Sequence, residues 1–163
     1  LELFNKIKTT IPNVSISTDI IVGFPGETED DFNDTLSLAE ECKFDNAFTF
    51  IYSPRENTPA AKLEDNVTLE EKENRLYRLN EVVNKYFLEN NQKLVDKVVK
   101  VLVEGKNTNG RDGMYGYTDT NKLINFDGDE NLTGKIIDVK VTSAKTWSLD
   151  GVINEWYNFR WSW

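Results

Sequence analysis

The hydrophobic period of the chain changes once, near Lys97, and this change restricts the possible folds more than any other feature of the sequence. Upstream of Lys97, apolar side chains recur at helical spacing: Leu76, Leu79, Val83, Tyr86 and Leu94. Downstream, they recur at every second position in two runs, residues 99–103 and 137–141. The 163 residues therefore contain a helical part and a β part, with the boundary near Asp96.

Residues 15–52 have the pattern of a strand, a helix and a second strand. The apolar run Ile20–Phe24 is typical of a strand buried on both faces. Thr28 and Asp31 have the spacing of a capping box, which predicts a helix through about Cys42, and residues 45–52 follow as the second strand. Such a βαβ unit has parallel strands.

A loop and a long helix are predicted next. Residues 53–67 contain two prolines and no clear period, which indicates a loop. Thr68 and Glu71 form a second capping-box pattern, and no Gly or Pro interrupts the helical spacing before Gly105. We therefore predict a helix from Leu69 to Asp96.

The C-terminal part has the pattern of short strands. A glycine-rich turn region at residues 105–116 is followed by one strand near residues 117–126 and a turn at residues 127–129. Four or five short strands in fewer than about sixty residues favour a small closed or nearly closed β-barrel. The expected fold class is therefore α/β plus all-β.

The composition limits the chemistry of this chain. It has no His and one Cys, so a Ser-His-Asp triad, a Cys-His pair, His-ligated metal sites, four-thiolate metal sites and internal disulfides are excluded within this chain. The net charge is -9: residues 1–96 carry 10 Lys and Arg against 19 Asp and Glu, whereas residues 97–153 carry 8 against 8. Any RNA would therefore be bound locally, because no strongly basic half exists.

The N-terminal decapeptide has neither a signal-peptide pattern nor an initiator Met, and no apolar run approaches the about 18 residues of a membrane helix. We therefore expect a cytoplasmic protein, without a membrane partner, that is an excised piece of a longer chain. The tail 154–163 holds five aromatic residues without a period. It docks on a groove, contacts a partner, or does not belong to the natural protein.

Two regions are candidate binding sites. The segments Gly23–Thr28 and Ile51–Arg55 follow the two predicted parallel strands, so they should meet at one sheet edge and form a cleft. The alternative is a tight turn and an ordinary strand exit. In the β part, aromatic, polar and basic residues are interleaved as in oligonucleotide-binding barrels: Arg111, Tyr115, Tyr117, Thr118, Thr120, Asn121 and Lys122. The alternative there is a solvated face.

Three strings carry a resemblance: TDIIVGFPGET (residues 18–28), FTFIYSPR (residues 48–55) and TNKLINFDGD (residues 120–129). With these strings the chain resembles the methylthiotransferase family of radical S-adenosylmethionine enzymes. In that family a cluster-binding domain precedes a partial β/α barrel and a C-terminal TRAM domain, an RNA-binding barrel. The resemblance implies the end of the barrel at residues 1–67, a connector helix at 68–96, a TRAM domain at 97–153 and a tail of uncertain origin at 154–163.

The resemblance also implies ligands. S-adenosylmethionine would be bound by Gly23, Phe24, Pro25, Ile51, Tyr52 and Ser53, and RNA by Arg111, Tyr117, Thr118, Thr120, Asn121 and Lys122. The family uses two 4Fe-4S clusters held by cysteines, and this chain has no such set, so the fragment alone should be inactive. The common radical-enzyme motif GxIxGxxE is matched only at Ile21 and Gly23, since Asp19 and Gly26 replace its first Gly and its Glu.

The implied reaction of the parent enzyme adds a 2-methylthio group to N6-isopentenyladenosine beside the anticodon of tRNA. Related enzymes modify threonylcarbamoyladenosine in tRNA or an aspartate of a ribosomal protein, and both stay open as alternatives. A third alternative is an RNA-binding module without catalysis. Because a truncated barrel leaves a strand edge and an apolar face uncovered, self-association between copies is also expected.

Overall fold

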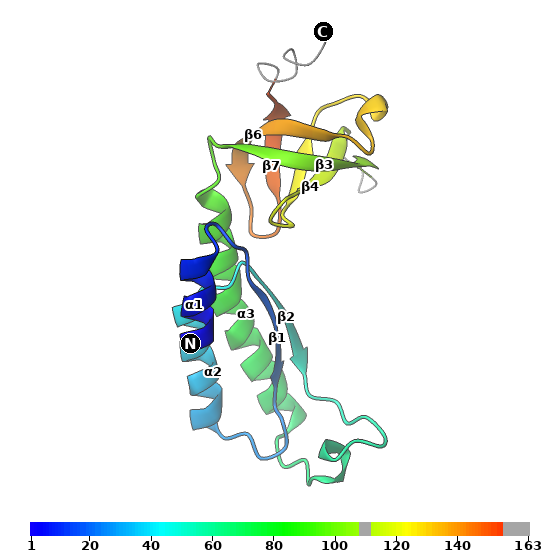
Figure 1. The fold of residues 1–163 in the computed structure, drawn as a ribbon. Helices are drawn as coiled ribbons and strands as arrows, with labels where there is room; N and C mark the ends of the chain where they lie inside the picture. The colour runs from blue at the N-terminus through cyan, green and yellow to red at the C-terminus, as the bar shows by residue number, and fades with distance from the viewer. Residues whose placement is uncertain (108–111, 155–163) are drawn as a thin grey trace. The chain divides into compact units, whose positions relative to one another are not determined.

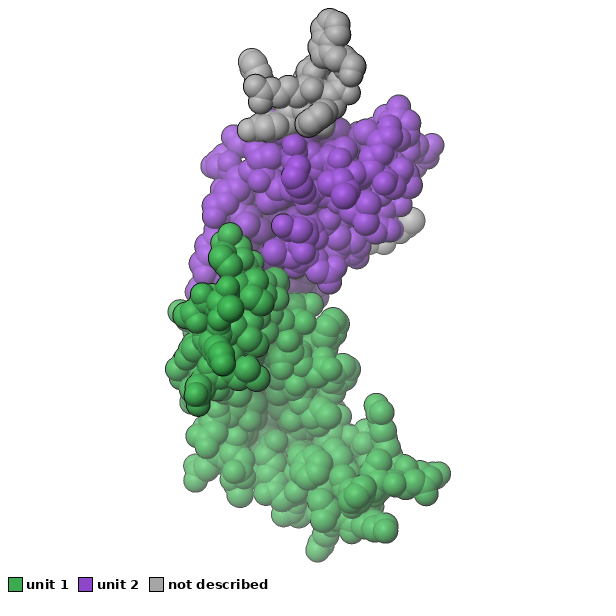
Figure 2. Space-filling view, viewed as in Figure 1, with its two compact units in different colours: residues 1–87 green, residues 88–163 purple. Residues whose placement is uncertain are grey.

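The computed structural model describes residues 1–107 and 112–154, and it separates into an N-terminal unit, residues 1–87, and a C-terminal unit, residues 88–163 (Figures 1 and 2). The division falls inside the long helix α3, Leu69–Gln92. No helix of the described part of the chain is long and apolar enough to cross a membrane.

The N-terminal unit contains the predicted βαβ arrangement. Strands β1 (Ser17–Val22) and β2 (Asn46–Ile51) pair in parallel, with Ser17 opposite Asn46 and Val22 opposite Ile51, and helix α2 (Glu29–Cys42) connects them. A helix that the sequence patterns did not reveal, α1 (Glu2–Thr10), precedes β1. A single turn of 3-10 helix, η1 (Ala60–Lys62), lies in the predicted loop.

Capping and apolar packing explain these helices. Thr28 accepts a hydrogen bond from the Asp31 N–H, and the Asp31 carboxylate accepts one from the Thr28 N–H, which confirms the predicted capping box. The unit's core joins β1 to α2 and α3 through buried apolar side chains: Val22, Phe32, Ala39, Leu79, Val83 and Phe87.

The helices cover only one face of the two-stranded sheet. On the other face, at least half of the surface of each of Ile21, Phe48 and Phe50 is exposed. Register places Ile21 opposite Phe50, so these side chains form one continuous apolar face. The expectation that the run Ile20–Phe24 is buried on both faces is therefore wrong within this chain, because nothing among the described residues covers the second face.

Helix α3 ends at Gln92, four residues before the predicted end at Asp96. The N–H groups of Leu94 and Val95 donate to carbonyls three residues back, which tightens the chain into turns, and Asp96 adopts a left-handed conformation at φ 66°. The Asp96 N–H then donates to the Val141 carbonyl at 2.9 Å. The backbone of Asp96 thus already belongs to the β structure.

The C-terminal unit is a closed barrel of five strands in the order β3-β4-β5-β7-β6, which confirms the predicted small barrel (Figure 1). The strands are β3 (Val98–Lys106), β4 (Met114–Thr118), β5 (Leu123–Phe126), β6 (Ile136–Ala144) and β7 (Leu149–Ile153). A 3-10 turn, η2 (Glu130–Leu132), precedes β6. The interior is filled by apolar side chains: Val101, Val103, Met114, Ile124, Phe126, Ile137, Val139, Val141 and Leu149.

The prediction of one strand at residues 117–126 is wrong, because this segment is a hairpin whose turn separates β4 from β5. The Thr118 N–H donates to the Lys122 carbonyl, and the Thr118 hydroxyl accepts from the Lys122 N–H, both at 3.0 Å. Asn121 adopts a left-handed conformation at φ 58°, which Asn tolerates better than most residues. These bonds reverse the chain without a glycine, so the usual turn signal is absent.

The glycine at position 116 permits close contact between β3 and β4. A Cβ atom there would lie 2.3 Å from the Leu102 carbonyl oxygen and 2.7 Å from a Val101 methyl carbon. Both contacts are closer than atoms tolerate, so a larger residue would force the two strands apart. The predicted glycine-rich turn region is accordingly shorter than residues 105–116, since β3 continues through Lys106 and β4 begins at Met114.

Candidate functional site

The carboxyl ends of β1 and β2 bring the two segments of the predicted cleft together. Val22 pairs with Ile51, and the Tyr52 N–H donates to the Val22 carbonyl at 2.8 Å. The rings of Phe24 and Tyr52 meet edge to face with their centroids 5.0 Å apart. The segments Gly23–Pro25 and Ile51–Ser53 therefore lie side by side, at the edge of a parallel sheet where α/β proteins commonly bind ligands.

Packing against α3 explains why position 23 is a glycine. Gly23 is buried in a left-handed conformation at φ 71°, and a Cβ atom there would lie 2.3 Å from Cγ of Lys72. Its N–H donates to Glu27 Oε1 at 2.9 Å. A glycine is thus needed at position 23 for its left-handed conformation and for its close contact with Lys72, and its N–H already donates to Glu27.

Lys72 lies beneath the same edge and is only 5% exposed. Its Nζ pairs with Asp65 Oδ2 at 2.5 Å and lies 5.4 Å from the centroid of the Tyr52 ring. The Tyr52 hydroxyl oxygen is buried and has no hydrogen-bond partner among the described residues. Since buried polar atoms are usually paired, this hydroxyl distinguishes Tyr52 from the other five residues assigned to S-adenosylmethionine.

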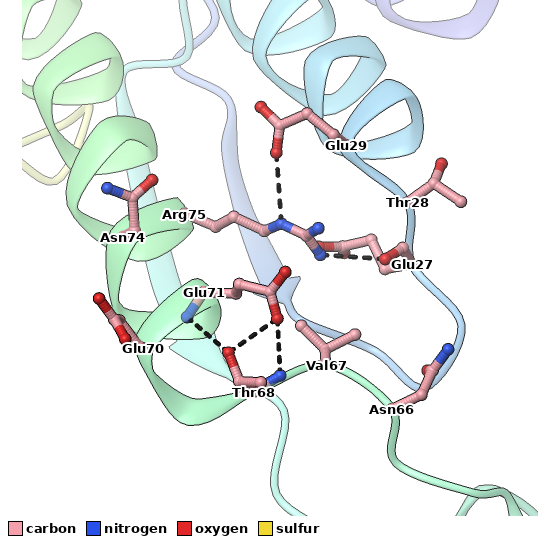
Figure 3. Close-up of a pocket in the computed structure, with 10 residues that line it drawn as sticks. All are labelled: Glu27, Thr28, Glu29, Asn66, Val67, Thr68, Glu70, Glu71, Asn74 and Arg75. Atoms are coloured by element: carbon pink, nitrogen blue, oxygen red, sulfur yellow. Dashed lines mark hydrogen bonds and ion pairs between the residues drawn. The ribbon is translucent and has the colours of Figure 1, made fainter.

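A buried ion pair anchors the loop after β1 to α3 (Figure 3). Arg75 Nη1 lies 2.7 Å from Glu27 Oε1 and donates to the Glu27 carbonyl at 3.1 Å, and the two side chains are 7% and 12% exposed. Glu29 lies 3.7 Å from Arg75 Nε and 2.7 Å from Arg78 Nη1. Sequence reasoning assigned no role to Glu27, Lys72 or Arg75.

The positions of Lys72 and Arg75 in the sequence do indicate that these two residues are buried. Lys72 and Arg75 stand at helical spacing from Leu79 and Val83, on the apolar stripe of α3. Charged residues on the buried face of a helix need partners, because isolated buried charges are strongly disfavoured. Their placement on this stripe therefore predicts acidic groups in the loops that the helix covers.

A cavity of about 530 Å³ lies beside this ion pair, between the first turns of α2 and α3 (Figure 3). Its lining is rich in carboxylates and consists of Glu27, Thr28, Glu29, Asn66, Val67, Thr68, Glu70, Glu71, Asn74 and Arg75. None of the six residues assigned to S-adenosylmethionine is among them. Hydrogen bonds from Thr68 lower the pKa of Glu71, as those from Thr28 lower the pKa of Asp31. These acidic groups cap helices.

The predicted RNA-binding residues lie at the end of β4 and in the turn that follows. Tyr117 is 37% exposed and meets the Tyr115 ring edge to face at 6.4 Å. Asn121 is exposed, while Thr120 and Lys122 are half-buried. Thr118 is 6% exposed, with its hydroxyl bonded inside the turn, so it shapes this surface rather than presenting a group to a ligand. Arg111 lies outside the described residues.

The single thiol of this chain, that of Cys42, is buried. Cys42 lies at the end of α2, and burial raises the pKa of its thiol. Among residues 1–107 and 112–154, no group of three or more Cys, Asp or Glu side chains is arranged to hold a metal ion.

The chain is similar to one known domain family in its C-terminal part and to known proteins over most of its length. Residues 92–153 match the TRAM domain. The chain is 56% identical over 155 residues to the tRNA-2-methylthio-N(6)-dimethylallyladenosine synthase of Bacillus cytotoxicus and 56% identical over 151 residues to that of Bacillus mycoides. These alignments cover 95% and 93% of this chain and 30% of each relative, so the chain spans less than a third of their length. The resemblance to the methylthiotransferase family is thereby confirmed.

Replacing Glu27 by Gln should destabilise the N-terminal unit by about 3 kcal/mol, because it leaves the buried Arg75 guanidinium without its carboxylate. Chemical denaturation of the purified chain measures this change. The matched control is Glu29→Gln, whose carboxylate is 54% exposed and whose loss should cost less than about 1 kcal/mol. Equal effects of the two substitutions would contradict the assigned role of the buried pair.

Proposed function

We propose that this chain is the C-terminal part of a tRNA methylthiotransferase that adds a 2-methylthio group to N6-isopentenyladenosine next to the anticodon, and that its barrel binds the tRNA. The observation that carries the proposal is the identity of 54–56% over nearly the whole chain to enzymes named for this product, together with the TRAM match. Such a protein works in the cytoplasm, where tRNA is modified.

Two features support a contribution to an S-adenosylmethionine site. Phe24 and Tyr52 form an aromatic edge beside the exposed residue Ser53, and the buried Tyr52 hydroxyl lacks a partner among the described residues. In this proposal Phe24, Pro25 and residues 51–53 line one wall of the cofactor site, while Gly23 positions the loop. S-adenosylmethionine, with the two 4Fe-4S clusters, supplies the radical chemistry.

The cysteines for both clusters lie elsewhere in the parent enzyme under this proposal, because this chain has one Cys and the clusters need sets of thiolates. The chain alone is therefore inactive and keeps the tRNA-holding role.

The specific observation of a single buried thiol also favours the second candidate function, an RNA-binding module without catalysis. Enzymes acting on threonylcarbamoyladenosine or on a ribosomal-protein aspartate remain the catalytic alternatives.

The proposed RNA surface combines Tyr117, Thr120, Asn121 and Lys122, and Arg111, the other predicted residue without a structural role, lies outside the described residues. Thr118 acts on it indirectly, because its hydroxyl holds the Lys122 N–H and contacts the Thr120 hydroxyl at 3.0 Å. An aromatic ring, amide and hydroxyl groups, and a cation within one hairpin suit the bases, sugars and phosphates of RNA.

Transfer RNA from cells with and without the gene that encodes this chain tests the catalytic proposal. Nucleoside mass spectrometry should find 2-methylthio-N6-isopentenyladenosine only in cells that carry the gene, with N6-isopentenyladenosine accumulating in the others. Unchanged tRNA nucleosides would exclude this substrate and favour a ribosomal-protein target or a binding module.

Lys122→Ala should weaken binding of an anticodon stem-loop RNA and reduce the slope of log affinity against log salt by about 1, since one phosphate contact is lost. Fluorescence anisotropy over a salt series measures both quantities. Lys106→Ala is the matched control, because Lys106 lies at the end of β3 that is away from the β4–β5 turn and pairs there with Glu130. An equal loss of RNA affinity in both variants would exclude a local RNA surface at the β4–β5 turn.

We further propose that the apolar face of Ile21, Phe48 and Phe50 associates between copies when no other part of the parent enzyme covers it. Sedimentation velocity over a concentration series should show self-association that the Phe48→Ser/Phe50→Ser double variant abolishes. Ile136→Ser, which changes an exposed apolar residue of the barrel, should leave it unchanged. A concentration-independent monomer would refute this expectation.

A further inference from the structure

The turn between β6 and β7, residues 145–148, presents an indole at its tip. Trp147 is 69% exposed, although a Trp side chain is among the largest apolar groups available to a protein. A single exposed apolar residue is common on protein surfaces and needs no function by itself. What distinguishes Trp147 is the way in which its turn is held and where the turn lies.

The turn is fixed by a buried amide. Asn91 is 4% exposed, and its Nδ2 donates to the carbonyls of Lys145 at 2.8 Å and Thr146 at 3.1 Å. Its Oδ1 is buried without a partner among the described residues, so holding the turn in this way has an energetic cost. The backbone on the N-terminal side of Trp147 is therefore ordered independently of any ligand.

Further bonds close the same turn. The Lys145 N–H donates to the Ser148 carbonyl at 2.8 Å, and the Lys145 ammonium lies 2.5 Å from the Asp150 carboxylate. A side chain carried on a rigid turn loses less conformational entropy when it binds a partner than one on a flexible loop. The position of the Trp147 backbone is accordingly set before any partner arrives.

Strand register places this turn beside the predicted RNA-binding turn. Strands β5 and β7 pair in parallel, with Ile124 opposite Leu149 and Phe126 opposite Gly151. The β4–β5 turn leads directly into β5, and the β6–β7 turn leads directly into β7. Both turns therefore leave the barrel at the same end, as Figure 1 shows.

The two turns carry complementary groups. Thr120, Asn121 and Lys122 carry hydroxyl, amide and ammonium groups, which suit the sugar-phosphate backbone, while the neighbouring Asp119 carries an exposed carboxylate. Trp147 presents an indole that is 69% exposed. Unpaired RNA bases stack on aromatic faces irrespective of sequence, while paired bases are already stacked within a helix. The combination is suited to a strand with exposed bases.

We propose that Trp147 stacks on an unpaired base of the RNA whose backbone the β4–β5 turn contacts. This inference rests on the proposed RNA-binding function and adds to it a residue, a contact type and a preference for single-stranded over paired nucleotides.

Binding of the full chain to an anticodon stem-loop RNA, and to the stem alone as a duplex, tests the inference. Trp147→Ala should weaken stem-loop binding by about 5- to 150-fold, the range found when one stacking side chain is removed. Trp147→Phe should restore most of the affinity. Because stacking involves no counterion release, the salt slope should stay unchanged, in contrast to that of Lys122→Ala.

Tyr77→Ala is the matched control, since Tyr77 is a 63% exposed aromatic residue of the N-terminal unit. It should bind both RNAs like the unmodified chain. The inference is overturned if Trp147→Ala binds the stem-loop normally, or if it weakens binding of the duplex equally. If the unmodified chain binds neither RNA, the proposed function fails, and the inference fails with it.

Discussion

The ion pair between Arg75 and Glu27 is the interaction on which the arrangement of the N-terminal unit depends. It joins the second turn of α3 to the loop after β1, and the same Glu27 carboxylate accepts the Gly23 N–H, so one acidic group fixes both the helix and the turn. Removing a charge from water is costly, and only the paired, hydrogen-bonded geometry compensates for it. The strand ends and the aromatic edge of Phe24 and Tyr52 are thereby held where a ligand would meet them.

Because the loop after β1 is anchored in this way, the presence of Gly23 has a structural explanation. A glycine after a parallel strand suggests that a ligand approaches the backbone, yet Gly23 is required because Lys72 occupies the space of a side chain. The chain departs from the common radical-enzyme motif at Asp19 and Gly26, and the structure accounts for Gly23 without a cofactor. Under the proposed function, any contribution to cofactor binding at this edge consequently depends on Phe24, Pro25 and residues 51–53.

How far the sequence predicts this structure depends on whether a feature is local. The capping pattern of Thr28 and Asp31 and the alternation in β3 and β6 involve near neighbours, so the helix, the parallel pair and the barrel could be predicted. The β4–β5 turn could not, because Thr118 and Asn121 reverse the chain through side-chain hydrogen bonding and a left-handed conformation rather than through glycine. Asn91 contacts a turn 54 residues away, and Arg75 contacts a loop 48 residues away, so neither contact has a local pattern.

The barrel interior limits where the C-terminal unit can act. Nine buried apolar residues fill it, and strands β3 and β4 approach too closely at Gly116 to admit even a methyl group. A ligand must therefore bind at the outer surface or at a barrel end. Because residues 97–153 carry equal numbers of acidic and basic side chains, general attraction to phosphate is weak, and short-range contacts must supply most of the affinity. The parallel pairing of β5 and β7, in an otherwise antiparallel barrel, gathers such groups by bringing two turns to one end.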